Sequence, residues 1–326
     1  MKIASTTCLF KSAFHKVPSF NEQSSKMSES ERKNTDQKYV LITGASAGIG
    51  YELAKVFSAE GYKVIGASRT VMDSQSPLVA KHGVISVPCD ITKLDDIKRL
   101  EDVVFKETGG YLDILYNNAG IAIGGPAAEM DETKVDMMFQ ANVIGQINVT
   151  KHLAPFVVNA KGIIVFTGSV SANLPLAWSS VYSATKAAID AYARTLHGEM
   201  EPFGVKVYNI ITGGVNTGIG AKESPAEVEK LLQNSLYNVD GLSESIIATK
   251  EMTEKDGMNA GLYARDVVQK ILGRPNKFNL YGGGNGYTLN FIGRYYPLWS
   301  VEYIMQWYFK QLRVFRNIRK LVLKGA

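Results

Sequence analysis

The chain has 326 residues, of which 45% are hydrophobic and 21% are charged, and its formal net charge is +5. This composition gives no sign of a disordered or a repeat protein, and the length suits one large α/β domain with extensions. The positive charge gathers near the C-terminus, in Lys310, Arg313, Arg316, Arg319, Lys320 and Lys324. Because the rest of the chain is nearly neutral, we expect no nucleic-acid partner.

Cysteine and histidine usage sets two further expectations. The only cysteines are Cys8 and Cys89, which lie in unrelated contexts, so we expect no disulfide framework and a reducing compartment. The four histidines are scattered without metal-ligand spacing, so we expect no metal site.

Residues 1–37 are predicted to be a disordered or targeting extension outside the fold. Serine and threonine are frequent there, and Lys2, Lys11 and Lys16 precede the first acidic residue. A targeting presequence is one interpretation, although the segment is poor in arginine. Translation that starts at Met27 is another.

From residue 38 the pattern changes to short apolar runs that alternate with helical periodicity. The runs predict strands at 39–43, 63–67, 84–87, 112–116, 162–166 and 205–209, with a further edge strand at 279–283. Helices are predicted over 49–60, in a stretch ending at Lys106, over 135–158 and in a segment that contains 184–200. This alternation favours a Rossmann-type, doubly wound parallel sheet in a single catalytic domain, which we place at 38–286.

A glycine-rich turn joins the first predicted strand to the first predicted helix. It reads TGASAGIG over 43–50, at the place where a dinucleotide-binding fold holds the phosphates. Glycine lets the backbone turn tightly and approach a pyrophosphate, and the helix N-terminus adds free N–H groups and a favourable dipole. We therefore predict that Gly44, Ser46, Gly48, Ile49 and Gly50 bind the cofactor.

The same turn also contains G-x-S-x-G, the pattern of a hydrolase nucleophile elbow, with Ser46 as the nucleophile. An elbow belongs on a later strand, with an acid and a histidine after it in the chain. No histidine stands out as such a partner, so we favour the phosphate contact. A lipid-surface serine hydrolase stays open as the alternative from another class.

The end of the second strand indicates which dinucleotide binds. It reads Ala67-Ser68-Arg69, without the Asp or Glu that would bond the ribose 2′-hydroxyl of NAD. An arginine at this place suits the 2′-phosphate of NADP. We therefore expect NADPH or NADP+ as the cofactor, bound by Arg69 with help from Ser68.

Tyr182 and Lys186 form the sharpest catalytic motif. Their i,i+4 spacing places them on one face of a predicted helix, one turn apart. A free phenol has a pKa of about 10, and a neighbouring ammonium lowers that pKa. The pair can therefore act as a general acid or base, although Y-x-x-x-K alone also occurs on surface helices.

Further motifs accompany this pair in a fixed order. They are Asn117-Asn118-Ala119-Gly120, then Asn142, then Ser169, which lies thirteen residues before Tyr182. With the glycine turn, these motifs make the chain resemble the classical short-chain dehydrogenase/reductase family over residues 38–275.

The resemblance implies a catalytic role for each matching residue. Tyr182 would protonate the substrate carbonyl oxygen while hydride arrives from the nicotinamide. Lys186 would lower the pKa of Tyr182 and hold the nicotinamide ribose, and Ser169 would donate a hydrogen bond to the same carbonyl oxygen. Asn142 would anchor a proton-relay water and an irregular helix turn.

The resemblance also implies further cofactor contacts. Asp90 would contact the adenine, and Asn117, Ala119 and Gly120 would line the cofactor cleft. The nicotinamide end would be contacted by Gly213, Val215 and Thr217. The family has Pro-Gly after the sixth strand, whereas this chain has Thr212-Gly213, so the resemblance leaves the details of that contact open.

Four segments narrow the resemblance to a subgroup. They are YNNAG at 116–120, VFTGS at 165–169, YARTLHGEM at 192–200 and ITGGV at 211–215, and they are similar to fungal 1-acyldihydroxyacetone-phosphate reductases. That subgroup implies NADPH-dependent reduction of a lipid ketone to lysophosphatidic acid, on the cytoplasmic face of the endoplasmic reticulum and on lipid droplets. The cytosol and the mitochondrial outer membrane are alternative locations. Alternative substrates are other lipophilic carbonyls, such as a steroid, a retinoid or a 3-keto-lipid.

Residues 218–262 follow the sixth strand, where such folds place a substrate-covering segment. Apolar side chains are available there to line a site for an acyl chain, namely Leu231, Leu232, Leu236, Tyr237 and Leu242. Helices over an acyl chain and an ordinary packed cap fit this pattern equally well.

Residues 287–326 are predicted to be an aromatic and basic membrane-surface tail. The aromatic residues are Phe291, Tyr295, Tyr296, Trp299, Tyr303, Trp307, Tyr308 and Phe309. No run of eighteen apolar residues occurs, so a spanning helix is disfavoured, and aromatic side chains beside a basic helical face suit an interfacial helix. A homo-oligomer contact and a helix packed on the domain are the alternatives. A cofactor-binding scaffold without turnover is disfavoured, because Ser169, Tyr182 and Lys186 are all present.

Overall fold

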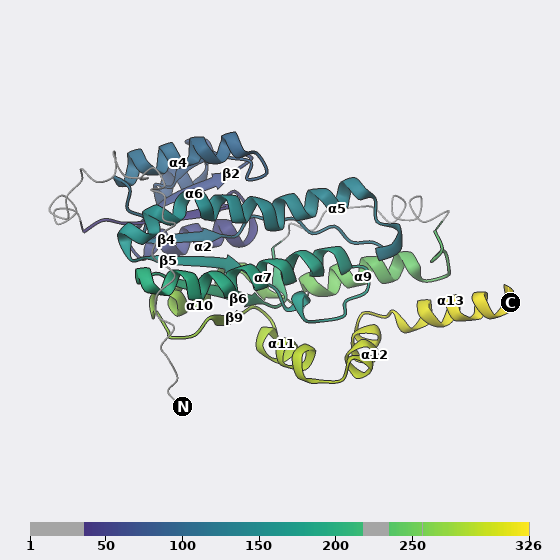
Figure 1. The fold of residues 1–326 in the computed structure, drawn as a ribbon. Helices are drawn as coiled ribbons and strands as arrows, with labels where there is room; N and C mark the ends of the chain where they lie inside the picture. The colour runs from purple at the N-terminus through teal and green to yellow at the C-terminus, as the bar shows by residue number, and fades with distance from the viewer. Residues whose placement is uncertain (1–35, 218–234, 256, 326) are drawn as a thin grey trace, which may run out of the picture. The chain divides into compact units, whose positions relative to one another are not determined.

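The computed structural model describes residues 36–217, 235–255 and 257–325. At its centre lies a seven-stranded sheet in the order β3-β2-β1-β4-β5-β6-β9, with every neighbouring pair parallel (Figure 1). The strands are β1 (Lys38–Thr43), β2 (Tyr62–Ser68), β3 (Ile85–Pro88), β4 (Ile114–Asn117), β5 (Ile163–Thr167), β6 (Lys206–Thr212) and β9 (Asn279–Gly282). The first six follow the order of a dinucleotide-binding sheet, and β9 adds an edge strand.

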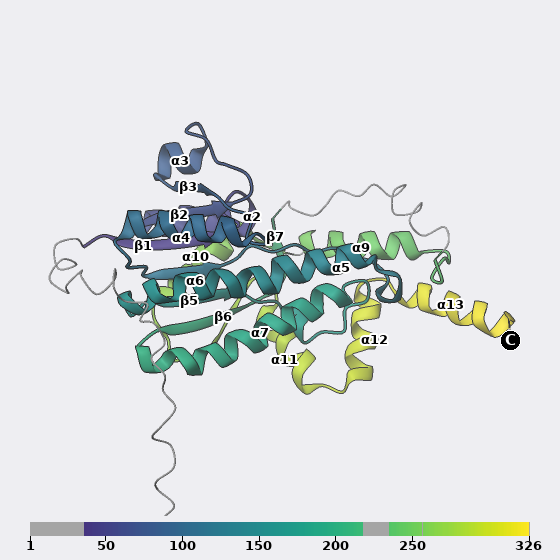
Figure 2. The ribbon, with the colours of Figure 1, turned by 45° about the horizontal axis from the view of Figure 1, so that its top comes forward.

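Helices cover both faces of the sheet (Figure 2). One face carries α4 (Leu94–Thr108), α6 (Gly145–Ala160) and α7 (Ser180–Met200). The other carries α2 (Gly48–Ala59), α3 (Pro77–His82) and α10 (Ala260–Leu272). The predicted doubly wound fold is therefore confirmed.

The central strands are mostly apolar because both of their faces are buried. Along β1, Val40 and Ile42 pack toward α2 and α10, whereas Leu41 packs on the opposite side. All three are fully buried. A fully buried aliphatic side chain contributes about 1.5–3 kcal/mol relative to an exposed one, so these runs hold the two helix layers on the sheet.

Two predicted elements begin two or three residues away from the expected position, whereas several others differ by one residue. The fourth strand starts at Ile114 rather than at Leu112, because the Leu112 N–H is taken by the Phe156 carbonyl at 3.0 Å. The long helix starts at Glu132 instead of 135, since the Asp131 side chain accepts the Thr133 N–H as an N-cap. It consists of α5 (Glu132–Phe139), a π-helical turn at Gln140–Ile144 and α6.

Several short or late elements have no counterpart in the sequence prediction. They include α3, α10 and the small pair β7 (Val215–Asn216) and β8 (Met258–Asn259). In the predicted substrate-covering segment, α9 spans Leu242–Lys255, while Leu231 and Leu232 lie outside the described residues. The predicted extension up to residue 35 also lies outside them.

The C-terminal segment forms three helices, α11 (Gly286–Tyr295), α12 (Leu298–Tyr308) and α13 (Leu312–Gly325). Val301, Met305 and Phe309 pack with Val170 and Ile211 next to the sheet. In α13, Val314 and Phe315 pack with Trp178 and α9. Within the described ranges, no helix is both long enough and apolar enough to cross a membrane.

Candidate active site

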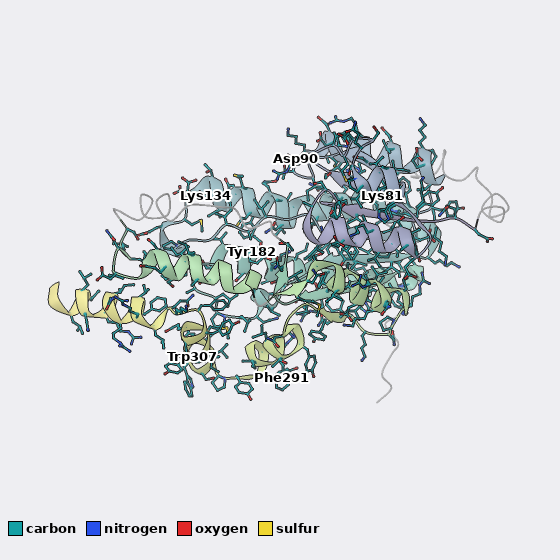
Figure 3. All side chains as sticks on the ribbon, turned by 180° about the vertical axis from the view of Figure 1, so that it is seen from behind. Lys81, Asp90, Lys134, Tyr182, Phe291 and Trp307 are labelled. Carbon is teal, nitrogen blue, oxygen red and sulfur yellow. The ribbon has the colours of Figure 1, made fainter. Side chains whose placement is uncertain are left out.

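The predicted site residues gather at the carboxyl ends of the parallel strands. The strand order reverses between β1 and β4, and such a switch point is where a doubly wound sheet binds its ligand. Tyr182 and Asp90 project into this part of the molecule from α7 and from the end of β3 (Figure 3).

The glycine turn after β1 has the backbone that its sequence predicts. Gly44 and Gly48 have φ of 70° and 55°, in the left-handed region that favours glycine. A Cβ at Gly50 would lie 2.2 Å from the Gly44 carbonyl oxygen, so the turn closes too tightly for any side chain. Ser46 and Ile49 are partly exposed beside it, at the N-terminus of α2.

The turn is tied to the end of β4 through Thr43 and Asn118. The Thr43 hydroxyl accepts the N–H groups of Asn118 and Ala119, each at 3.0 Å. The Asn118 amide donates to the Thr43 carbonyl at 3.0 Å and accepts from the Thr167 hydroxyl at 3.2 Å. Sequence reasoning did not choose Asn118 or Thr43, although Asn118 stands inside the motif that it singled out.

Asn117 and Gly120 occupy different surroundings. The Asn117 side chain is fully buried and donates to Thr150 of α6 at 3.0 Å, so the amide faces the protein interior. Gly120 is exposed, and a Cβ there would lie 2.9 Å from the Asn142 side-chain oxygen. A ligand that approaches this loop would therefore contact its backbone atoms rather than side chains of Asn117 or residue 120.

Asn142 sits inside the π-helical turn between α5 and α6. Its side-chain oxygen accepts the Ile121 N–H at 2.8 Å, and its amide donates to the Ile121 carbonyl at 2.8 Å and to Thr185 at 3.0 Å. The irregular helix turn implied by the resemblance is thus present. The side chain holds the loop after β4 against α7.

Arg69, Ser68 and Asp90 lie at the carboxyl ends of β2 and β3. Arg69 is exposed, whereas Ser68 is buried and its hydroxyl donates to the Thr70 carbonyl at 2.7 Å. A bond from Ser68 to a phosphate would therefore have to replace this bond to Thr70. Burial acts to raise the pKa of Asp90, but hydrogen bonds from Thr92 and the charge of Arg69 outweigh it, so the pKa is lowered.

Ser169, Tyr182 and Lys186 converge from the end of β5 and from α7. The Lys186 ammonium donates to the Thr167 carbonyl at 2.8 Å and lies 5.7 Å from the centre of the Tyr182 ring. Burial lowers the pKa of Lys186 to about 8. Burial raises the pKa of Tyr182, and a hydrogen bond with the Ser169 hydroxyl opposes that rise.

The turn after β6 carries the last group of predicted residues. Thr212 bonds the hydroxyl of buried Tyr263 at 2.8 Å, and a Cβ at Gly213 would lie 2.1 Å from the Gly284 carbonyl oxygen. Val215 is buried in β7, and Thr217 ends the described part of this turn. The side chain of Thr212, which stands where the family has proline, is therefore held by a hydrogen bond to α10.

The hydrolase interpretation of Ser46 receives no support from the described residues. His152 pairs with Glu101 at 2.6 Å, and His197 bonds the Val207 carbonyl at 3.1 Å. Within those same residues, no hydrogen bond joins a histidine to Ser46. Ser46 lies instead at the first strand-to-helix turn, where phosphates bind in such sheets.

Comparison with known proteins gives consistent matches. The family model of short chain dehydrogenases matches residues 38–228. An NADPH-dependent 1-acyldihydroxyacetone phosphate reductase of Saccharomyces cerevisiae is 36% identical, over 84% of this chain and 91% of its own. A protein of the same name from Schizosaccharomyces pombe is 38% identical, over 62% of this chain and 68% of its own.

Solved structures agree with this fold. A short-chain dehydrogenase from Streptomyces avermitilis matches with a TM-score of 0.67 at 26% identity, over 86% of this chain and 98% of that one. An alcohol dehydrogenase from Thermococcus sibiricus, complexed with 5-hydroxy-NADP, matches with a TM-score of 0.60 at 21% identity, over 76% of this chain and 96% of that one.

Proposed function

Because this chain belongs to the short-chain dehydrogenase family, we propose that it reduces the ketone of 1-acyldihydroxyacetone phosphate with NADPH. The product is 1-acylglycerol 3-phosphate, or lysophosphatidic acid. One observation carries the chemistry, namely the convergence of Ser169, Tyr182 and Lys186 at the end of β5. The substrate is supported by two relatives that bear the name of this reductase.

The residues present fit NADPH. The closed glycine turn at 44–50 leaves backbone N–H groups at the start of α2 for a pyrophosphate. Exposed Arg69 stands where a 2′-phosphate needs a cation, and no acid occupies that strand end. Asp90, Ala119 and Gly120 would line the adenine and ribose side, where Asn117 can offer only backbone atoms because its side chain faces Thr150, and Gly213, Val215 and Thr217 would lie at the nicotinamide end. When bound, NADPH supplies the hydride that reduces the carbonyl carbon.

Each catalytic side chain has a separate task. Tyr182 gives its phenolic proton to the carbonyl oxygen as that oxygen gains electrons. Ser169 donates a hydrogen bond to the same oxygen and so stabilises its developing negative charge. Lys186, held on the Thr167 carbonyl, keeps a positive charge beside the phenol and favours its ionised form. Asn142 fixes the loop after β4 against α7.

The first test is consumption of NADPH by the purified protein with synthetic 1-acyldihydroxyacetone phosphate. Tyr182→Phe removes the proton donor, so turnover should fall by about 10²–10⁴-fold while NADPH still binds. NADH in place of NADPH is the cofactor control. Binding of NADPH without its oxidation would overturn the substrate assignment and turn attention to steroids, retinoids and 3-keto-lipids.

We further propose that α11 and α12 lie on a lipid surface. Their exposed aromatic side chains are Tyr287, Phe291, Tyr295, Tyr296, Trp299, Tyr303, Trp307 and Tyr308. In Figure 3, Phe291 and Trp307 point away from the molecule on the same side, opposite Asp90 and Lys81. Aromatic side chains suit the headgroup region, and the exposed Arg313, Arg316, Arg319 and Lys320 of α13 add attraction to anionic lipid.

This surface supports a location on the cytoplasmic face of the endoplasmic reticulum and on lipid droplets. A lipid ketone with an acyl chain resides in such membranes, so an enzyme held at their surface meets its substrate there. Imaging of a tagged chain, with organelle markers, tests the location. Diffuse cytosolic signal would contradict it.

A further inference from the structure

The hydroxyl oxygen of Ser169 accepts two hydrogen bonds from Ser171. The Ser169 oxygen accepts the Ser171 N–H at 3.1 Å and the Ser171 hydroxyl at 2.8 Å. Ser171 is only 3% exposed, so water does not compete for these contacts. Ser171 belongs to the short 3₁₀ turn at Val170–Ala172, and Ser169 is the N-cap of that turn.

A serine hydroxyl has one hydrogen to donate and two lone pairs with which to accept. At Ser169 the two contacts from Ser171 fill both lone pairs. Ser169 then keeps only its hydroxyl hydrogen for a further hydrogen bond, and the Tyr182 phenol is within hydrogen-bonding reach of it. Ser169 can donate a hydrogen bond in the site but can no longer accept one.

We propose that Ser171 is a positioning residue that fixes the direction of the hydrogen bond at Ser169. With Ser171 in place, Ser169 donates its one hydrogen to the Tyr182 oxygen when the site is empty and to the carbonyl oxygen when substrate is bound. Hydrogen bonds in a chain polarise one another, so donation from Ser171 also makes Ser169 a stronger donor. The relevance for turnover rests on the proposed reductase function, whereas the direction of the hydrogen bond does not.

The turn that carries Ser171 is held from outside the catalytic group. The Asn173 amide donates to the Asn290 side-chain oxygen of α11 at 3.0 Å. Val170 and Leu174 pack in the apolar cluster with α12. Ser171 is thus presented to Ser169 by a rigid support, as a positioning group requires.

Loss of the Ser171 hydroxyl has a predictable effect on Tyr182. One lone pair of Ser169 becomes available, and the Tyr182 phenol can then donate to Ser169. This reversal stabilises the protonated phenol, so the pKa of Tyr182 rises. Two other titratable groups act at this place, Lys186 on the same helix and Tyr263 of α10, and the substitution changes neither.

The decisive measurement is the titration of Tyr182 in the full-length protein without substrate. Tyrosines labelled with ¹³C at Cζ report ionisation by NMR, and Tyr182→Phe identifies the resonance of Tyr182 by its loss. We expect Ser171→Ala to move the titration to higher pH and Ser171→Thr to restore it. An unchanged titration in Ser171→Ala, or a threonine variant that behaves like alanine, would overturn the proposal.

Kinetics give the second readout. A neutral hydrogen bond corresponds to about 0.5–1.5 kcal/mol, so kcat should fall roughly two- to tenfold in Ser171→Ala with KM nearly unchanged. Ser183→Ala is the matched control, because the Ser183 hydroxyl is buried without a partner among the described residues. Ser171→Cys is the substitute if the alanine variant folds poorly. A thiol has a similar volume and is a weak donor, so the kcat of Ser171→Cys should also lie below that of the wild type.

The two assays separate this inference from the proposed function. If the wild-type protein fails to reduce 1-acyldihydroxyacetone phosphate, the substrate assignment fails while the NMR titration still decides the role of Ser171. If turnover occurs and the titration does not move in Ser171→Ala, the reductase stands and the role of Ser171 falls.

Discussion

Lys186 is 4% exposed, and burial lowers its pKa to about 8 from the ordinary value of 10.5. Between these two values the unfolded chain binds more protons than the folded one, so the free energy of unfolding rises with pH through that window. Cys89 acts in the opposite sense, since burial raises the pKa of its thiol from 9.0 to about 12. The contribution of Cys89 to the free energy of unfolding is therefore lost as pH rises from about 9 to about 12.

The Lys186 contribution can be isolated with Lys186→Met, which removes the titrating group and keeps the volume. Cys89 is present in both proteins, so its effect cancels in the difference. Without cofactor, the Tm of the wild type minus that of the variant should increase from about pH 8 to about pH 10. A difference that stays constant across this range would show that Lys186 titrates normally in the folded protein.

Among single residues, the sequence predicts those whose catalytic role follows from a fixed spacing along the chain. Tyr182 and Lys186 stand out because one helical turn must bring them together. Ser171 and Asn118 could not be chosen this way, because their importance lies in hydrogen bonds that only the folded loops create. Ser68 was predicted to help bind the phosphate; its hydroxyl donates to the Thr70 carbonyl, and its contact with the phosphate stays a prediction.

The π-helical turn between α5 and α6 is the element on which the loop after β4 depends. It places the Asn142 side chain between Ile121 and Thr185, where it makes three hydrogen bonds. A buried partner left unsatisfied costs about 1–3 kcal/mol. The turn therefore stabilises the fold as well as shaping the site.

Asn142→Ala should lower the free energy of unfolding by about 2–4 kcal/mol, because it removes two hydrogen bonds to the partly buried Ile121 backbone and one to the buried Thr185 hydroxyl. Urea unfolding followed by circular dichroism measures this difference. Asn159→Ala is the control, since among the described residues the Asn159 side chain makes one hydrogen bond, from α6 to the Gly110 carbonyl. Equal losses in the two variants would contradict a special role for the π-turn.

Strong apolar runs made the sheet strands predictable, whereas the elements outside that pattern were missed. All seven strands of the sheet were expected, since each is a short buried run next to a turn. The π-turn interrupts a segment whose periodicity reads as one helix, and α10 begins at an Asn259 cap that was overlooked. β7 and β8 are two residues each, too short for any periodic signal.

Across the whole molecule, the aromatic face of α11 and α12 and the basic side of α13 distinguish this chain from a plain dinucleotide-binding domain. Trp299 and Trp307 are 74% and 66% exposed. Burying such large side chains in a headgroup layer stabilises the bound state by about 25 cal/mol per Å² of apolar surface removed from water. The division of the chain at residues 286 and 287 stays a prediction.

Vesicle flotation tests the proposed lipid surface. The double variant Trp299→Ser, Trp307→Ser should bind vesicles at least about tenfold more weakly, because two anchors are lost. Binding of the wild type should strengthen with phosphatidylserine and weaken with salt. Phe105→Ser with Phe203→Ser removes exposed aromatic side chains from α4 and from the turn after α7, and should leave binding unchanged.

The contact between α13 and the loop before α7 has a genetic consequence. Phe315 stacks on Trp178 at 5.6 Å, and Trp178 holds a left-handed backbone with φ of 68°, unusual for so large a residue. A nonsense or frameshift mutation late in the reading frame, just after Gln311, would leave every catalytic residue encoded. It would nonetheless strip the cover from Trp178 and Leu242, so such an allele should yield a protein that cellular quality control removes.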